Sequence, residues 1–264
     1  MNNTAAKKRI FKIVSAVISL LFWILVWAIV SYRVNNEFLL PDPLLTLKRL
    51  LELAAEKDFW ISTSSSLLRI LIGIGIAVLL GCIAAILSSA LEFANSLFSP
   101  LMTVVKATPI ASFICLAYLW IRPSTLPIFI TALIVLPIVW SNVVSGIRSV
   151  DKNLLEVAKV YRFSPSKKLL RIYVPSVLPY FLAACRSSLG MAWKAGIAAE
   201  VIAPTEKAIG TEIYFAKNYF ETPDLFAWTL TVIILSIIIE KLLIWGLSRL
   251  SQKLRVAEVH NDKI

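Results

Sequence analysis

Charged side chains and catalytic side chains are both scarce in this chain of 264 residues. Charged residues make up 16% of the sequence, against roughly a quarter in an ordinary soluble domain. The one histidine, His260, lies in a polar tail, and no paired carboxylates, Ser/His/Asp set or metal cluster is evident. The three cysteines, Cys82, Cys115 and Cys185, have neither metal-ligand spacing nor a disulfide pattern. We therefore expect no enzyme, no catalytic residue and no metal site.

Signals for binding nucleotides or nucleic acids are also missing. No G-x-x-x-x-G-K-[ST] run occurs, so the chain cannot hold the phosphates of ATP in the Walker manner. The formal net charge is +11, but no basic groove with interleaved aromatic residues accompanies it. We predict no cofactor in this chain and no nucleic-acid partner.

Long apolar runs dominate instead. Hydrophobic residues make up 58% of the sequence, and a helix needs roughly 20 apolar residues to cross a bilayer core of about 30 Å. We find six candidate spans, the third and fifth weakened by charges or proline: 13–30, 70–87, 97–121, 126–147, 177–203 and 225–247. The pattern predicts an all-α polytopic membrane helix bundle with about six transmembrane helices, forming a single transmembrane domain over residues 1–264. The first run is too long for a signal peptide, so we expect it to be retained.

The distribution of basic residues indicates the orientation. With six spans both termini lie on one side of the bilayer, and the loop 148–175 shares that side. This side holds Lys7, Lys8, Arg9, Lys12, Arg148, Lys152, Lys159, Arg162, Lys167, Lys168, Arg171, Arg249, Lys253, Arg255 and Lys263. The other side holds the smaller group Arg33, Lys48, Arg49, Lys57, Arg122, Lys207 and Lys217. The positive-inside rule then places both termini and the loop 148–175 in the cytoplasm.

Two segments on the outer side stand out between the spans. Leucines in residues 43–58 are spaced as on an amphipathic helix that lies on the membrane surface. The outer loop 204–224 is longer than a turn requires, which is typical of a segment used for contact or gating.

The cytoplasmic segment 151–179, DKNLLEVAKVYRFSPSKKLLRIYVPSVLP, is polar although very hydrophobic runs flank it. Ser164-Pro165 is typical of a cap followed by the first turn of a helix. We therefore predict two short helices, after which Pro175 and Pro179 mark the return to the membrane. One face of the first helix is expected to carry Leu154, Leu155, Ala158 and Tyr161. Such a helix can bind in a groove of a partner protein.

This segment resembles the cytoplasmic EAA signature of ABC importer permeases. Glu156-Val157-Ala158 stands for E-A-A, and Ile172-Tyr173-Val174-Pro175 stands for I-x-L-P at the family's spacing. Further short matches are similar to marks of the subfamily that imports nitrate, taurine, sulfonates and bicarbonate: LPDP at 40–43, ATPI at 107–110, AE at 199–200 and IG at 209–210.

The resemblance implies a MetI-like permease fold in a multi-pass protein of the bacterial inner (plasma) membrane. It also implies three partners. An ABC ATP-binding subunit would bind the ATP, an extracytoplasmic solute-binding protein would deliver the solute, and a second permease copy would complete a homodimer.

The same resemblance assigns ATPase coupling to the loop 151–175. The matching residues are Glu156, Ala158, Arg162, Ser164, Pro165, Ile172 and Pro175. Arg162 stands where the family has glycine, and a positive φ is costly for arginine. We expect a relaxed turn with normal coupling at this point. The alternative is a contact between the Arg162 side chain and the ATPase.

Charges inside predicted spans are costly and indicate function by default. We name Lys194, Glu200 and Arg186 as candidates for the translocation path. Lys194 either faces the path and attracts an anion, or snorkels, or pairs with an acid such as Glu240. We expect Glu200 to be hydrated near the outer end of its span, and Arg186 to reach the cytoplasmic interface.

Together these features predict the permease subunit of an ATP-driven importer for a small, anionic or polar organic solute. The alternative is a stand-alone secondary transporter or channel. That class often shows inverted repeats, but we find no repeat between the halves, and such a carrier needs no docking loop. A membrane scaffold without transport is a third possibility.

Overall fold

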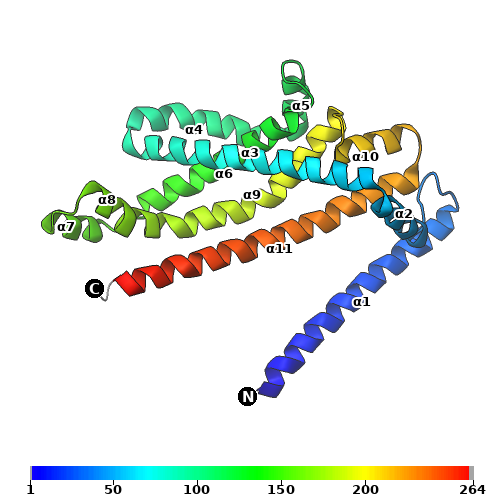
Figure 1. Cartoon of the computed structure of the whole chain (residues 1–264), viewed down its shortest axis with the longest axis horizontal. Coiled ribbons are helices and arrows are strands. Elements are labelled where there is room, and N and C mark those ends of the chain that lie inside the picture. The colour runs from blue at the N-terminus through cyan, green and yellow to red at the C-terminus, as the bar shows by residue number, and fades with distance from the viewer. Residues whose placement is uncertain (1, 262–264) are drawn as a thin grey trace. The chain divides into compact units, whose positions relative to one another are not determined.

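Helices account for all regular structure in the described part of the protein. The computed structural model describes residues 2–261, with side chains at 11, 14–246 and 249 (Figure 1). This confirms the all-α prediction. In chain order the helices are α1 (Asn2–Val34), α2 (Pro43–Ala55), α3 (Lys57–Ala90), α4 (Glu92–Ala107), α5 (Ile110–Tyr118), α6 (Leu126–Arg148), α7 (Lys152–Val160), α8 (Pro165–Lys168), the π-helix η1 (Leu169–Tyr173), α9 (Val174–Ile202), α10 (Ile209–Asn218) and α11 (Thr222–Asn261).

Five stretches among the described residues are long and apolar enough to cross a membrane. They are Val14–Val34, Lys57–Ala90, Leu126–Arg148, Pro165–Ile202 and Thr222–Gly246. A sixth would require α4 and α5 to be counted as one span. The expected number of about six spans thus holds only with that pairing.

The weak third span predicted over 97–121 is sharply bent at Pro109, one of the residues that weakened it. The helices α4 and α5 meet at an angle of 103°. Thr108, between them, is extended with ψ 133°. The cause is Pro109, because a proline forces the preceding residue out of the helical region and lacks an N–H of its own.

The chain divides into two compact units, Met1–Trp60 with Glu212–Thr231, and Ile61–Thr211 with Val232–Ile264. In the first unit, Asp42 caps α2 by accepting a hydrogen bond from the Leu45 amide at 2.7 Å. Arg49 on α2 forms a two-pronged ion pair with Asp224 at the start of α11, with Nη2 to Oδ2 at 2.9 Å. The surface helix ends at Ala55 rather than residue 58, because Glu56 is extended before α3 begins.

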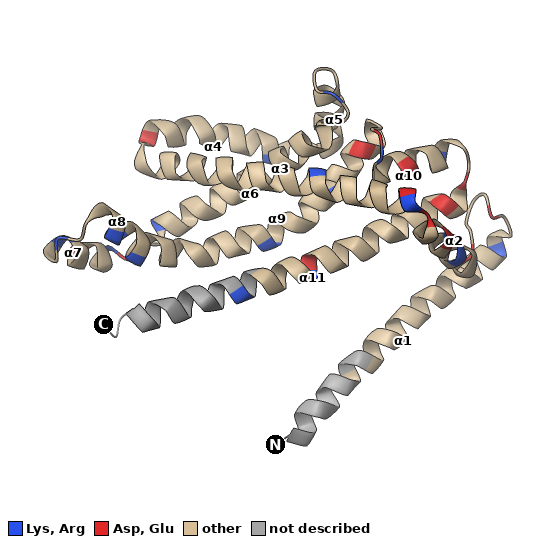
Figure 2. Cartoon of the chain, in the orientation of Figure 1, with Lys and Arg blue, Asp and Glu red and all other residues tan. Residues whose placement is uncertain are grey.

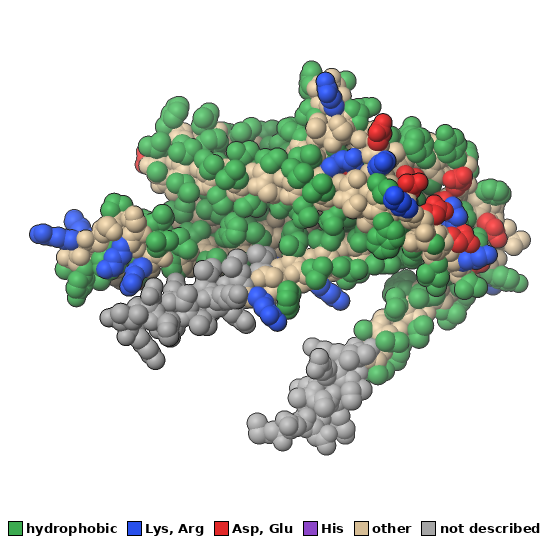
Figure 3. Space-filling view, viewed as in Figure 1, with side chains coloured by type: hydrophobic (Ala, Val, Ile, Leu, Met, Phe, Trp, Pro, Cys, Tyr) green, Lys and Arg blue, Asp and Glu red, His purple; other side chains and the backbone are tan. Residues whose placement is uncertain are grey.

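The core of the second unit lies where α5, α6 and α9 meet. Ile114, Leu126, Ile130, Ala195 and Ala199 are buried there. Small alanines on α9 allow α5 and α6 to pack closely against it. Most of the visible surface over α3, α4 and α9 is hydrophobic (Figure 3), as expected for helices surrounded by lipid.

Candidate functional site

The loop 151–175 folds into two short helices, and local sequence explains both starts. Asp151 caps α7 by accepting a hydrogen bond from the Asn153 amide at 2.8 Å. Ser164 accepts one from the Lys167 amide at 3.4 Å, with Pro165 as the first residue of α8. Caps of this kind satisfy amides that have no partner within the helix. The helix start predicted at Ser164-Pro165 is therefore confirmed.

The turn between the two helices keeps a left-handed residue. Arg162 has φ +51°, its amide donates to Lys159 O at 3.1 Å, and the Phe163 amide donates to Ala158 O at 2.8 Å. These two bonds define a Schellman motif, which usually has glycine at the left-handed position. The expectation of a relaxed turn is wrong, because the two hydrogen bonds outweigh the steric cost of about 1–2 kcal/mol.

A small hydrophobic core holds this hairpin together from beneath. Val150, Ala158 and Ile172 are buried, and Leu155 and Phe163 pack against them. Two of the predicted coupling residues, Ala158 and Ile172, therefore support the hairpin from inside instead of facing outward.

The apolar face predicted for α7 is split by this packing. Leu155 and Ala158 point inward, whereas Leu154 and Tyr161 are 48% and 73% exposed. Successive residues on a helix differ by about 100°, so the edge of the buried core passes between Leu154 and Leu155.

The outer face of the hairpin is apolar and bordered by cations. Leu154, Val157, Val160 and Tyr161 are all exposed. Glu156 is also exposed, and Figure 2 shows Lys and Arg gathered on α7 and α8. An exposed apolar face of this kind is typical of a protein-binding surface.

The helix continues from α8 into the membrane through a π-turn. The Val174 amide donates to Leu169 O, which gives the widened turn of η1. Pro175 follows directly, and its ring would clash with the carbonyl four residues earlier in a regular α-helix. The π-turn thus lets the helix pass Pro175, so the chain runs as one continuous helix through the two prolines that were predicted to mark its return to the membrane.

Two of the intramembrane cations lie on one exposed face of α9. Arg186, Ser187, Met191 and Lys194 are all exposed, at helical spacing. Gly190 lies among them, and a Cβ there would meet no atom within 4 Å. Among the described residues neither Arg186 nor Lys194 takes part in an ion pair, so the pairing of Lys194 with Glu240 is not formed.

Glu200 is fully buried, so the expectation of a hydrated side chain is wrong. Its Oε2 accepts hydrogen bonds from Ser66 Oγ at 2.8 Å and from the Gly210 amide at 3.2 Å. Its Oε1 lies 3.5 Å from Arg69 Nη1. The carboxylate therefore joins α3, α9 and the start of α10, where an anion is favoured by the helix dipole.

The same cluster fixes the loop 203–208. Arg69 donates to the carbonyls of Glu206 and Lys207 at 2.9 and 3.3 Å, and Ser66 Oγ accepts from the Ile209 amide at 2.9 Å. A Cβ at Gly210 would lie 2.4 Å from Glu200 Cβ, so only glycine allows this approach. The matches at 199–200 and 209–210 thus form one structure.

Sequence reasoning missed Ser66 and Arg69. Arg69 lies immediately before the uncharged run 70–87, and an arginine at the edge of a span needs an acidic or carbonyl partner. The position of Arg69 at the edge of the span is the sequence signal that could have identified Glu200 as its partner. Ser66, one of several hydroxyl residues in a row, carried no such signal.

In the first unit, a group of carboxylates affects Glu212 on α10. Burial is the main cause that raises the pKa of Glu212, and Asp58, Asp224 and Glu56 raise it further. A hydrogen bond to Asp224 is also the main cause that raises the pKa of Arg49, so this guanidinium stays charged at all ordinary pH values.

Comparison with known proteins gives a consistent result. Residues 77–256 match the family described as "Binding-protein-dependent transport system inner membrane component". The bicarbonate transport system permease protein CmpB of Synechococcus elongatus is 27% identical over 242 residues, covering 86% of this chain and 85% of the relative. The taurine transport system permease protein TauC of Escherichia coli is 24% identical over 220 residues, covering 81% and 80%.

The fold is similar to that of a solved transporter. A bacterial ABC transporter involved in alginate import has a TM-score of 0.57 at 14% identity, covering 96% of this chain and 99% of that one. The same kind of transporter in complex with its alginate-bound periplasmic protein has a TM-score of 0.53. The chain thus has the fold of ABC transporter permeases, as the EAA resemblance implied.

Proposed function

The chain belongs to the family of binding-protein-dependent transport system inner membrane components, and from this premise we propose that it imports a small anionic solute through a dimeric pathway. It is a multi-pass membrane permease of the ABC transporter class, which makes it a transport protein and not an enzyme. Permeases of this class work with an ATPase and a solute-binding protein.

The observation that carries the proposal is the hairpin 151–175. It presents an exposed apolar face on α7 with a border of cations, and α7 ends in the left-handed turn at Arg162. Because the chain has no nucleotide-binding loop, the energy must come from another subunit. We assign this surface to the ATPase, with Glu156 and Arg162 at its edge and with Ser164, Pro165 and Pro175 shaping the helices beneath it.

The exposed face of α9 supports an anionic solute and a second copy of the chain. Arg186 and Lys194 lie on this face with small residues between them, and a cationic face is costly against lipid. A homodimer would turn two such faces toward each other and form a positively charged path. Bicarbonate, which a relative transports, is an anion that suits such a path.

The orientation follows from the basic residues. With both termini and the hairpin in the cytoplasm of a bacterial cell, the loop 203–208 lies on the outer side of the inner membrane. The Glu200 cluster gives this loop a defined shape, which suits contact with the solute-binding protein.

Reconstitution tests the function. Vesicles are prepared with the permease, its ATPase and its binding protein. They should take up the solute only when ATP is present on the side of the membrane where the ATPase lies. Uptake driven by an ion gradient without ATP would instead support the stand-alone carrier.

The anion path is tested by Lys194→Met. Loss of one charge-assisted contact should raise the KM for uptake about tenfold or more. Lys241→Met is the matched control, because Lys241 is an exposed cation on α11 and not on α9. Equal KM values for Lys194→Met and the wild type would contradict this assignment.

A further inference from the structure

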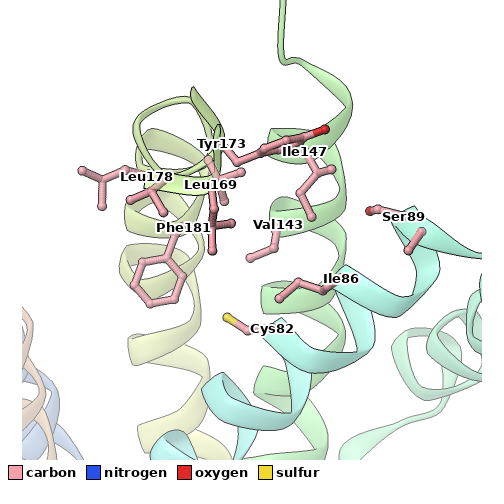
Figure 4. A pocket seen from close by; sticks show the side chains of 12 residues that line it. Cys82, Ile86, Ser89, Val143, Ile147, Leu169, Tyr173, Leu178 and Phe181 are labelled. Atoms are coloured by element: carbon pink, nitrogen blue, oxygen red, sulfur yellow. The ribbon is translucent and has the colours of Figure 1, made fainter. Parts of the chain in front are cut away.

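A cavity of about 490 Å³ lies beside the hairpin, within the second unit. The ends of α3 and α6 form two walls, and η1 with the start of α9 forms the third. Figure 4 shows Cys82 and Ile86 entering from α3, Val143 from α6, and Leu169, Tyr173 and Phe181 from the third wall. Nothing in the coupling or transport roles uses this space.

Close helix packing fixes the shape of the cavity. A Cβ at Gly146 would lie 3.1 Å from Val177 Cα, so α6 and α9 approach closely next to the cavity. The π-turn then carries Leu169 and Tyr173 across its third wall. π-turns occur frequently at functional sites, so the widened turn at this wall also favours a bound ligand in the cavity.

The side chains that line the cavity favour a hydrocarbon ligand. Only three of the twelve lining side chains carry a polar or sulfur atom, Cys82, Ser89 and Tyr173, and Ser89 Oγ already donates to Ala85 O at 2.8 Å. Leu169 and Val174 line the cavity and are also 54% and 42% exposed. Exposed leucine and valine side chains at the opening of a cavity are favourable next to lipid chains and unfavourable next to water. The cavity therefore opens toward the bilayer.

The rim of the cavity carries positive charge. Lys168 Nζ lies 5.9 Å from the centre of the Tyr173 ring, and Tyr173 lines the cavity. Residues 164–173 contain Lys167, Lys168 and Arg171 but no acid. Cations next to a membrane-embedded helix attract anionic lipid headgroups.

We propose that the cavity binds one acyl chain of an anionic phospholipid from the cytoplasmic leaflet, with its headgroup at Lys168. The leaflet rests on the proposed orientation of the chain. The bound chain would contact η1, the segment that joins the hairpin to α9. Anionic lipid would thereby stabilise one position of the hairpin relative to the spans.

Photolabelling tests the site directly. The full-length protein is placed in phosphatidylcholine vesicles that contain a trace of phosphatidylglycerol carrying a diazirine on one acyl chain. Label should concentrate in peptides covering 82–90 and 169–181. A phosphatidylcholine probe with the same acyl chain should label these peptides several-fold less. Equal labelling by the two probes would overturn the proposal.

Two variants and one control separate binding of the headgroup from binding of the acyl chain. Lys168→Gln should abolish the preference for phosphatidylglycerol, whereas Lys152→Gln, the same charge change on α7 outside the cavity, should preserve it. Ile86→Trp fills the cavity and should reduce labelling by both probes, while labelling of the exposed apolar face of α1 remains constant and reports an intact protein. Persistent cavity labelling in Ile86→Trp, or a preference retained in Lys168→Gln, would refute the assignment.

The test is independent of transport. Labelling requires neither ATP nor solute, so a failure of ATP-driven uptake leaves it interpretable. Loss of labelling would likewise leave the importer proposal intact. Crosslinks between two permease copies at these peptides would show that a second chain fills the cavity, and this too would overturn the proposal.

Discussion

The contacts of Glu200 predict how firmly the loop 203–208 is held. Glu200→Gln keeps the size of the side chain but removes its charge. In the wild type, Oε2 accepts two hydrogen bonds, from Ser66 and Gly210, and Oε1 faces Arg69. The amide oxygen can replace only one carboxylate oxygen, so the amide NH₂ group then meets Arg69 donor to donor.

The cost follows from the hydrogen bonds that lose their charge. Hydrogen bonds to a charged group contribute about 1.5–3 kcal/mol each, and neutral ones about 1 kcal/mol. Two weakened bonds therefore cost about 2 kcal/mol, which raises the open population of the loop about 30-fold. Glu200→Ala leaves Ser66 Oγ and the Gly210 amide without this acceptor and Arg69 without its carboxylate partner, and should cost about 3–5 kcal/mol.

Hydrogen exchange measures this opening. In nanodiscs, peptides spanning 203–212 should exchange about 30-fold faster in Glu200→Gln than in the wild type. Glu240→Gln is the matched control, because Glu240 is an exposed intramembrane acid on α11. Exchange within twofold of the wild type in Glu200→Gln would refute the reasoning that this carboxylate holds the loop.

Four further predictions concern single residues elsewhere in the chain. Arg162→Gly removes a left-handed penalty of about 1–2 kcal/mol but adds chain entropy of about 0.5–1 kcal/mol, so the hairpin amides should exchange a few-fold more slowly; faster exchange would contradict the observed turn. Gly210→Ala should displace the start of α10, because its Cβ would overlap Glu200, and should lower the melting temperature, whereas an unchanged one would contradict the close approach. Val157→Glu should leave folding intact, since Val157 is 48% exposed, but should abolish co-purification of the ATPase; retained binding would move the docking surface elsewhere. Glu212→Gln should stabilise the protein at neutral pH, because the raised pKa of Glu212 means that its ionised form opposes folding; this gain should vanish below the unfolded pKa of about 4.3, and a gain that grows as pH falls would have the wrong sign.

Local signals in the sequence predicted the helix starts well, because caps act within three residues. Ser164-Pro165 is the predicted case; Asp42 and Asp151 cap their helices by the same rule, although neither was identified as a cap from the sequence. The span count was nearly right for a similar reason, since apolar length alone determines which helices can cross a bilayer.

The errors arose where distant residues or competing local terms decide the outcome. Glu200 is buried because Ser66 and Arg69, 134 and 131 positions away, supply its partners. At Arg162 the sequence reveals the steric cost of a positive φ, but only the structure reveals what offsets it, the hydrogen bond from the Phe163 amide to Ala158 O and the packing beneath the turn. Free-energy differences of about 1–2 kcal/mol decide the conformation at such positions, and they depend on contacts that only the three-dimensional structure shows.

The uninterrupted helical stretch from Pro165 to Ile202 has a mechanical consequence. Its 38 residues form a lever about 57 Å long, with the hairpin at one end and Glu200 two residues from the other. A tilt of about 5° at the hairpin displaces the far end by about 5 Å at this length. Motion of the hairpin can thus reach the Glu200 end only as far as the helix stays rigid, and the widened π-turn of η1, close to the hairpin, is the place where the helix can bend and absorb part of that motion.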